Sequence, residues 1–142
     1  MGAKKINFSQ MDLLNWRHVL EEKRKEMTQN EETLRKAMLS ELSSESSGDH
    51  SRAPTHSAEL ASDNEGLNLL SSLSKKYLDS LYEIDFAMDR IDSGTFGICL
   101  GCGSGIHLER LVSLPESRYC RECAETEYQR LHSIKNKLRN SG

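Results

Sequence analysis

The sequence has few of the residues that build a broad hydrophobic core. Aromatic residues make up 6% and hydrophobic residues 36% of its 142 positions, whereas 29% of the positions are charged. A wide globular core needs more apolar material than this. The composition favours an elongated helical protein, in which each helix buries one stripe of side chains and leaves the rest in water.

The sequence also lacks membrane and export signals. No apolar run approaches the roughly 20 residues that are needed to cross a bilayer. The first residues, Met1 to Ile6, contain no apolar stretch typical of a signal peptide. We therefore expect a soluble cytoplasmic protein that does not act at a membrane.

An excess of positive charge is absent as well. The chain carries 22 acidic and 19 basic residues, which gives a formal net charge of −3. Proteins that grip nucleic acid through its phosphates usually present a net basic surface. Nonspecific binding to nucleic acid is therefore not expected as the main role.

Hydrophobic periodicity indicates two long helices. The first is expected to start near Phe8, with Ser9 as the N-cap and Asp12 in the first turn. Apolar residues then recur every seven positions at Leu13, Leu20, Met27 and Leu34. The second helix carries a heptad seam with one polar break, Ser74, and is expected to end at Gly94. The seam consists of Leu67, Leu70, Ser74, Tyr77, Leu81, Ile84, Met88 and Ile91.

Loop-forming residues separate these two helices. Residues 43–63 are rich in serine and include Gly48 and Pro54, and proline does not fit inside a helix. We expect a polar turn there, called the tip below, with helix resuming between residues 57 and 66. The predicted fold is mainly α: a long antiparallel coiled-coil hairpin over residues 1–94, then a small four-cysteine zinc finger and a C-terminal helix over residues 95–142. The last segment, Ala124 to Leu138, is expected to pack back on the finger or the hairpin.

All four cysteines form two Cys-x-x-Cys pairs that are separated by 17 residues. A Cys-x-x-Cys turn holds two thiolates close enough to share one ion, and two such turns complete a tetrahedron. Thiolates favour zinc over magnesium or calcium. A redox dithiol pair or an iron site is the competing interpretation, but no βαβ setting for a thioredoxin-like motif is visible. The sequence predicts one structural Zn²⁺ bound by Cys99, Cys102, Cys120 and Cys123.

The finger also carries a detailed motif. It reads Phe-Gly-x-Cys-x-x-Cys-Gly-x-x-Ile from Phe96, followed by Arg-Leu, Pro and the second Cys-x-x-Cys pair. In residue type and spacing this motif resembles the DksA/TraR family. The resemblance is detailed over residues 84–123 and continues as architecture over residues 8–83 and the last helix.

The resemblance implies a bacterial transcription regulator that binds RNA polymerase directly, without sequence-specific contact to DNA. In that family the coiled coil enters the polymerase secondary channel and its tip comes near the active site. Family members often carry Asp-x-x-Asp-x-Ala at the tip. Counting back from the first cysteine at the family's spacing, Glu59 retains the second acid, Ala61 matches, and His56 replaces the first acid. Asp63 is a nearby acid that could compensate.

Some family members respond to the alarmone ppGpp, an anionic ligand that needs basic contacts. The positions expected to supply those contacts hold Glu83, Leu114 and Ala124 in this chain, and none of them is basic. The sequence therefore does not favour an alarmone-dependent response.

Two other classes of function place different demands on the sequence. The alternative is a zinc-finger module that binds DNA or another protein without contacting polymerase. A DNA-binding module would need a basic recognition helix, and the last segment offers cations only after the acids Glu122, Glu125 and Glu127. An enzyme is least expected, because no nucleophile–base pair, phosphate loop or open metal site has convincing spacing.

Overall fold

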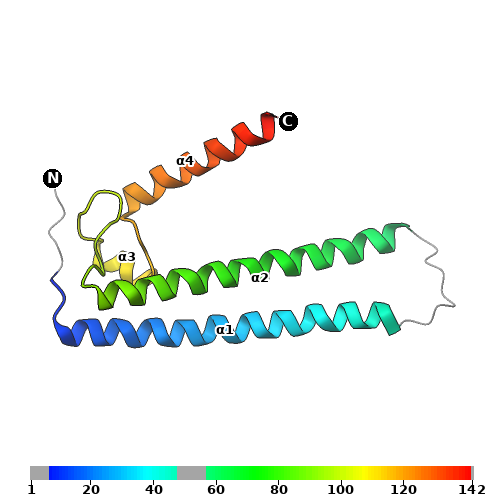
Figure 1. Cartoon of the computed structure of the whole chain (residues 1–142), viewed down its shortest axis with the longest axis horizontal. Coiled ribbons are helices and arrows are strands. Elements are labelled where there is room, and N and C mark those ends of the chain that lie inside the picture. The colour runs from blue at the N-terminus through cyan, green and yellow to red at the C-terminus, as the bar shows by residue number, and fades with distance from the viewer. Residues whose placement is uncertain (1–6, 48–56, 142) are drawn as a thin grey trace. The chain divides into compact units, whose positions relative to one another are not determined.

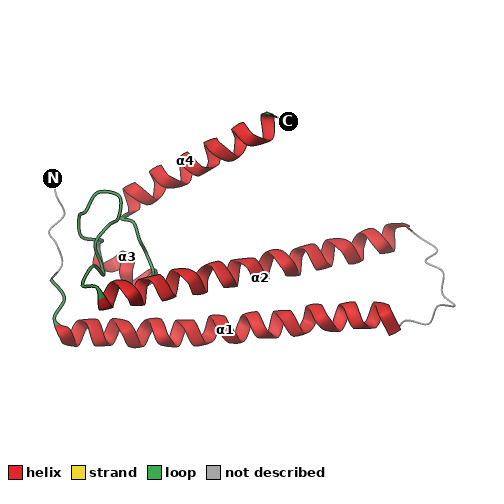
Figure 2. Ribbon diagram, in the orientation of Figure 1, coloured by secondary structure: helices red, strands yellow, loops and turns green. Residues whose placement is uncertain are grey.

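The computed structural model describes residues 7–47 and 57–141. Those residues contain four helices and no β-strand, and one isolated antiparallel bridge joins Ile98 to Gly105 (Figures 1 and 2). The mainly α fold class, with a helical hairpin, a small four-cysteine finger and a C-terminal helix, is confirmed. No helix in the described ranges combines the length and the apolarity that a membrane span requires. The helices are α1 (Gln10–Ser47), α2 (Ser57–Asp92), α3 (Leu108–Ser113) and α4 (Arg121–Asn140).

Contacts divide the chain into two compact units. One comprises Met1–Glu21 together with Glu83–Gly142, and we call it the base unit; the other is Glu22–Tyr82, the arm unit. Helices α1 and α2 each contribute one part to each unit, and in each unit they run in opposite directions (Figure 1). The part of the hairpin next to the finger thus groups with the finger. A domain boundary at residue 94 stays a prediction.

A reciprocal cap starts helix α1. The Ser9 hydroxyl accepts a hydrogen bond from the Asp12 backbone N–H at 3.1 Å, while the Ser9 backbone N–H donates to the Asp12 carboxylate at 2.9 Å. The Ser9 hydroxyl also donates to this carboxylate, and these bonds lower the pKa of Asp12. Two backbone N–H groups that the helix leaves unpaired are thereby satisfied. The predicted N-cap is confirmed.

The base unit contains the buried core. Fully buried Leu20 of α1 and Ile84 of α2 are both members of the predicted stripes, and Ile91 is also buried. Three aromatic rings connect the start of α1 with the finger: Phe8 and Trp16 each lie 5.7 Å from Phe96, measured between ring centroids. The hydrophobic core of the base unit therefore includes residues of both the finger and the hairpin.

The arm unit is packed less completely. The described seam residues of this unit, including Leu70, Tyr77 and Leu81, are half-buried, and none of its described side chains is fully buried. At the polar break, the Ser74 hydroxyl donates to the Glu31 carboxylate across the hairpin at 3.2 Å. The break is thus filled by a hydrogen bond between the two helices.

Helix α1 extends further into the serine-rich segment than predicted. Residues 43–47 belong to α1, whereas α2 begins at Ser57, within the range of 57–66 over which helix was expected to resume. Serine is tolerated at the end of α1 because its hydroxyl can bond back to the preceding turn. Ser43 donates to the Ser40 carbonyl at 3.0 Å, and Ser44 donates to the Glu41 carbonyl at 2.8 Å. The predicted breaker Pro54 lies outside the described residues.

Replacing Ile84 by alanine tests the buried seam of the base unit. Ile84 has no exposed surface, so Ile84→Ala should lower the free energy of unfolding by roughly 2–5 kcal/mol. Leu78→Ala is the matched control, because Leu78 lies on the same helix but is 53% exposed. Urea denaturation followed by circular dichroism measures both changes. Equal losses in the two variants would contradict the assigned seam.

Candidate metal centre

The finger begins where α2 ends. Gly94 adopts a left-handed backbone with φ +74°, which turns the chain away from the helix. The backbone N–H groups of Thr95 and Phe96 then both donate to the Arg90 carbonyl, at 2.9 and 3.0 Å. The predicted helix end at Gly94 is confirmed. The segment that leads from Gly94 to the first cysteine pair is fixed to the last turn of α2.

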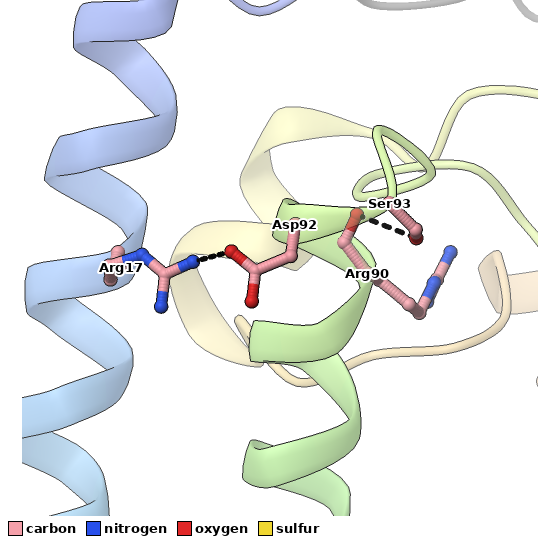
Figure 3. A network of polar contacts seen from close by, with 4 residues as sticks. All are labelled: Arg17, Arg90, Asp92 and Ser93. Carbon is pink, nitrogen blue, oxygen red and sulfur yellow. Dashed lines mark hydrogen bonds and ion pairs between the residues drawn. The ribbon is translucent and has the colours of Figure 1, made fainter.

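The side chain of Arg90 continues this attachment. It is 4% exposed, and its guanidinium donates to the carbonyl oxygens of Thr95 at 3.0 Å, Ser117 at 3.2 Å and Ile98. Burial lowers the pKa of Arg90, and the nearby Arg118 lowers it further. Figure 3 shows Arg90 beside Ser93, whose hydroxyl donates to the Arg90 carbonyl, and the Arg17–Asp92 ion pair that joins α1 to the end of α2.

The four cysteines converge in space. Their sulfur atoms all lie within 4.8 Å of one another, and Cys102 Sγ is 3.9 Å from Cys120 Sγ. Four sulfurs at about 2.3 Å from one zinc ion would lie about 3.8 Å apart at the corners of a tetrahedron. The described cluster therefore fits Zn²⁺ in both donor chemistry and spacing. Cys99 and Cys102 come from the turn after α2, and Cys120 and Cys123 come from the start of α4.

Backbone amides point at one of these sulfurs. The N–H groups of Cys120 and Gly101 donate to Cys99 Sγ at 3.2 and 3.4 Å. Burial alone raises the pKa of Cys99, but the amide hydrogen bonds outweigh it and bring the pKa to about 6. The neighbouring thiols of Cys120 and Cys99 raise the pKa of Cys123 to about 12. Crowding therefore opposes a set of four thiolates, and a central divalent cation supplies the charge that stabilises all four.

Short backbone bonds hold the two cysteine turns together. The Cys99 N–H donates to the Ser104 carbonyl at 2.7 Å, and the Leu100 N–H donates to the Arg118 carbonyl at 2.9 Å. The Arg110 guanidinium donates to the Tyr119 carbonyl at 2.9 Å, next to the second cysteine pair. These bonds link the turn after α2, helix α3 and the segment before α4.

Gly101 allows close packing at the sulfurs. A Cβ atom built on Gly101 would lie 2.9 Å from Cys123 Sγ, closer than real Cβ contacts. Gly103 needs its freedom for a different reason, because its φ is +71°. The glycine-rich character of the first Cys-x-x-Cys turn thus has one steric and one conformational cause.

A shallow hollow of about 300 Å³ lies on the side of the base unit that contains Glu83 and Leu114. The Arg118 guanidinium pairs with the Glu83 carboxylate and lies 4.1 Å from the Phe86 ring centroid. Leu114 contributes an apolar wall. Ala124, the third position that the family comparison predicted, is half-buried in α4 and is not among the residues that line this hollow.

The predicted tip residues are placed only in part. Glu59, Ala61 and Asp63 belong to the first two turns of α2. His56 lies outside the described residues. Their role as a polymerase-contacting site stays a prediction.

Sequence reasoning missed Arg90 as a residue that organises the site. Its one signal was a cation in the last turn of α2, and that placement has a simpler explanation in the helix dipole. His107 is exposed at the start of α3 and lines a hollow together with Cys102 and Cys120, but it is not a member of the described set of four sulfurs.

Two substitutions beside the cluster should affect zinc to different extents. Cys120→Ser removes one of the four thiolates and should abolish tight binding of one zinc per chain. Gly101→Ala should weaken binding, because the added methyl group displaces Cys123 Sγ. Gly66→Ala is the control, since nothing lies within 4 Å of a Cβ built there. Zinc content after dialysis against graded chelator measures all three.

Acid provides an independent check of the same site. Zinc binds the deprotonated thiolates, so affinity should fall as pH falls and protons compete for sulfur. Full zinc retention by Cys120→Ser, or equal zinc affinity in Gly101→Ala and the parent chain, would contradict the four-cysteine site.

Comparison with known proteins places this geometry in a family. The model of the prokaryotic DksA/TraR C4-type zinc finger matches residues 94–129. An uncharacterized protein from Aquifex aeolicus (strain VF5) is 33% identical over 103 residues, which cover 72% of this chain and 71% of that protein.

Solved structures show the same fold. Transcription factor DksA2 from Pseudomonas aeruginosa matches with a TM-score of 0.68 and 24% identity, over 87% of this chain and 88% of its own. DnaK suppressor protein from Agrobacterium tumefaciens C58 matches with a TM-score of 0.51 and 28% identity, over 85% and 98%. An RNA polymerase binding protein and transcriptional regulator from Chlamydia trachomatis matches with a TM-score of 0.52 and 17% identity, over 88% and 96%. With its helical hairpin and its four-cysteine finger, the chain belongs to the prokaryotic DksA/TraR family of C4-type zinc-finger proteins.

Proposed function

We propose that this chain is a bacterial transcription regulator that binds RNA polymerase directly and inserts its coiled-coil hairpin into the polymerase secondary channel. The observation that carries the proposal is the combination of a DksA/TraR finger with a helical hairpin that resembles DksA2. The similar Chlamydia protein is described as binding RNA polymerase. The chain acts in this proposal by contact and not by catalysis, in the cytoplasm.

Zinc has a structural role in this proposal. Cys99, Cys102, Cys120 and Cys123 are its ligands, and four thiolates close the coordination sphere, which leaves no open position for a substrate. The ion joins the turn after α2 to the start of α4. Zinc thereby stabilises the base unit, which contains the finger and the adjoining parts of α1 and α2.

The tip carries the regulatory effect. Glu59 and Asp63 are the acidic residues of the tip, and both belong to α2. Near the polymerase's catalytic magnesium ion, an added carboxylate can alter the local field and the path of the substrate. Ala61 matches the family motif, and His56 makes this copy less acidic and can gain charge below about pH 6.5.

The chain works without the alarmone ppGpp at the position that other members use. Glu83 brings a carboxylate to that position, and its partner Arg118 neutralises it from within the chain. Leu114 and Ala124 offer an anionic ligand no hydrogen-bond donor from their side chains. Adding ppGpp should therefore not change the effect of this chain in the transcription assay described below.

A DNA-binding module is the second candidate, and helix α4 bears on it. All three acids of α4 lie in its first half, where Arg130 is paired with Glu127, and three further cations lie toward its C-terminal end, where the helix dipole favours positive charge. A recognition helix usually presents cations along the face that enters the groove. A pulldown with core RNA polymerase, run beside a gel shift with random duplex DNA, separates the two functions.

Replacing Glu59 tests the tip mechanism. Glu59→Ala should abolish the effect on transcription in vitro while folding and polymerase affinity stay nearly intact, because binding depends on the rest of the hairpin and the finger. His56→Asp should strengthen the effect by restoring the family acid. The measurement is abortive-product yield at a sensitive promoter, with binding to core polymerase measured in parallel.

Glu32→Ala is the matched control for Glu59→Ala. Glu32 is an exposed glutamate in the middle of α1, so its loss should leave regulation unchanged. Regulation by Glu59→Ala that equals the parent chain would show that the tip mechanism is wrong here.

A further inference from the structure

Helix α4 presents an apolar stripe that the rest of the described chain leaves open. None of its residues is buried, although the sequence predicted that it packs back on the finger or the hairpin. Tyr128 is 71% exposed, Leu131 54% and Leu138 73%, and Ile134 is exposed beside them. These residues share one face, because they follow helical spacing. A monomer therefore leaves a continuous apolar stripe in water along a 20-residue helix.

Charge is distributed unevenly along the same helix. The first half carries the acids Glu122, Glu125 and Glu127 together with Arg121 and Arg130, whereas the second half carries only cations, at Lys135, Lys137 and Arg139. The helix thus has a weakly acidic first half and a basic second half. A second helix of identical sequence is complementary to it only when the two helices run antiparallel, because a parallel pair would bring acid beside acid and base beside base.

The positions of individual charges fit such a pair. Ala124 lies one turn before Tyr128 on the face of the stripe. Glu125 follows Ala124 by one position, and Arg139 follows Leu138 by one position, so both lie on the same flank of the stripe. When two identical helices pack antiparallel about a twofold axis, equivalent flanks meet and opposite ends lie together. Glu125 of one chain then faces Arg139 of the other, twice per dimer.

We infer that α4 is a self-association surface, through which two copies of this chain form an antiparallel dimer about a twofold axis near Leu131. Burying four stripe side chains on each helix removes on the order of 800 Å² from water, less than the roughly 1,200 Å² of a standard stable interface. The dimer is therefore weak and depends on concentration. The inference does not rest on polymerase binding, since the helix and its charges are independent of the tip.

Sedimentation equilibrium of the full zinc-loaded chain tests this surface. The parent chain should shift from monomer toward dimer between about 10 µM and about 1 mM, the range expected for a small interface. Leu131→Asp should keep it monomeric throughout, and it should not unfold the chain, because Leu131 is exposed. Gln129→Asp is the matched control: it adds the same charge on the opposite side of the helix and should preserve the dimer.

Charge reversal identifies the antiparallel arrangement. Glu125→Arg alone and Arg139→Glu alone should each weaken the dimer roughly tenfold, because attraction becomes repulsion at both symmetric contacts. An equimolar mixture of these two variants should recover association, since each chain then supplies the charge that the other needs. Circular dichroism of each variant checks that α4 remains helical.

Three results would overturn the inference. The first is a parent chain that stays monomeric over the whole concentration range, which would leave the stripe to a different protein. The second is a dimer that Leu131→Asp does not weaken. The third is a mixture of the two charge variants that associates no better than either variant alone.

Discussion

The buried guanidinium of Arg90 is the interaction on which the base unit depends. It bonds to carbonyl oxygens from both segments that lead to cysteines: Ile98 directly precedes Cys99, and Ser117 lies three residues before Cys120. Desolvating a cation is costly unless its donors are paired. Three carbonyl oxygens and the Phe86 ring, 6.0 Å from the guanidinium carbon, offset that cost, while Arg90 Nε has no partner among the described atoms. Arg90 thus joins the end of α2 to both segments that lead to the cysteines. Zinc bound by the four sulfurs would join the same two segments a second time.

Buried side chains are distributed unequally between the two units. The base unit contains every fully buried side chain of the described residues, together with the ring cluster of Phe8, Trp16 and Phe96. The seam of the arm unit is half-buried, and the Ser74–Glu31 hydrogen bond joins its two helices. Regions with few buried apolar contacts open at a lower free-energy cost than the core. In the proposed function, the hairpin that enters the channel therefore has its better packed part in the base unit and its more adaptable part in the arm unit.

Local patterns predicted the parts of the molecule that local physics determines. Heptad spacing predicted the seam from Leu67 to Ile91, and cysteine spacing predicted the four-sulfur cluster. The start of α1 and the end of α2 were predicted from the capping residues Ser9 and Gly94. The ring contact of Phe8 with Phe96 could not be predicted, because periodicity carries no information across 88 residues of chain. Arg90 resembles a residue that compensates a helix dipole, so its buried contacts were invisible. The serines at the end of α1 bond back to their own helix, and composition alone mistook them for a loop.

The central claim is that the tip contacts RNA polymerase. A photo-crosslinking residue at position 59 tests this claim most directly. A second crosslinker at position 32, in the middle of α1, reports on contact along the hairpin, and one at position 129 reports on helix α4 of the base unit. The account predicts that position 59 crosslinks to residues that line the secondary channel of core polymerase, and that Cys120→Ser reduces the yield by disrupting the finger. A chain that binds core polymerase but crosslinks only from position 129, or one that does not bind polymerase at all, would contradict it.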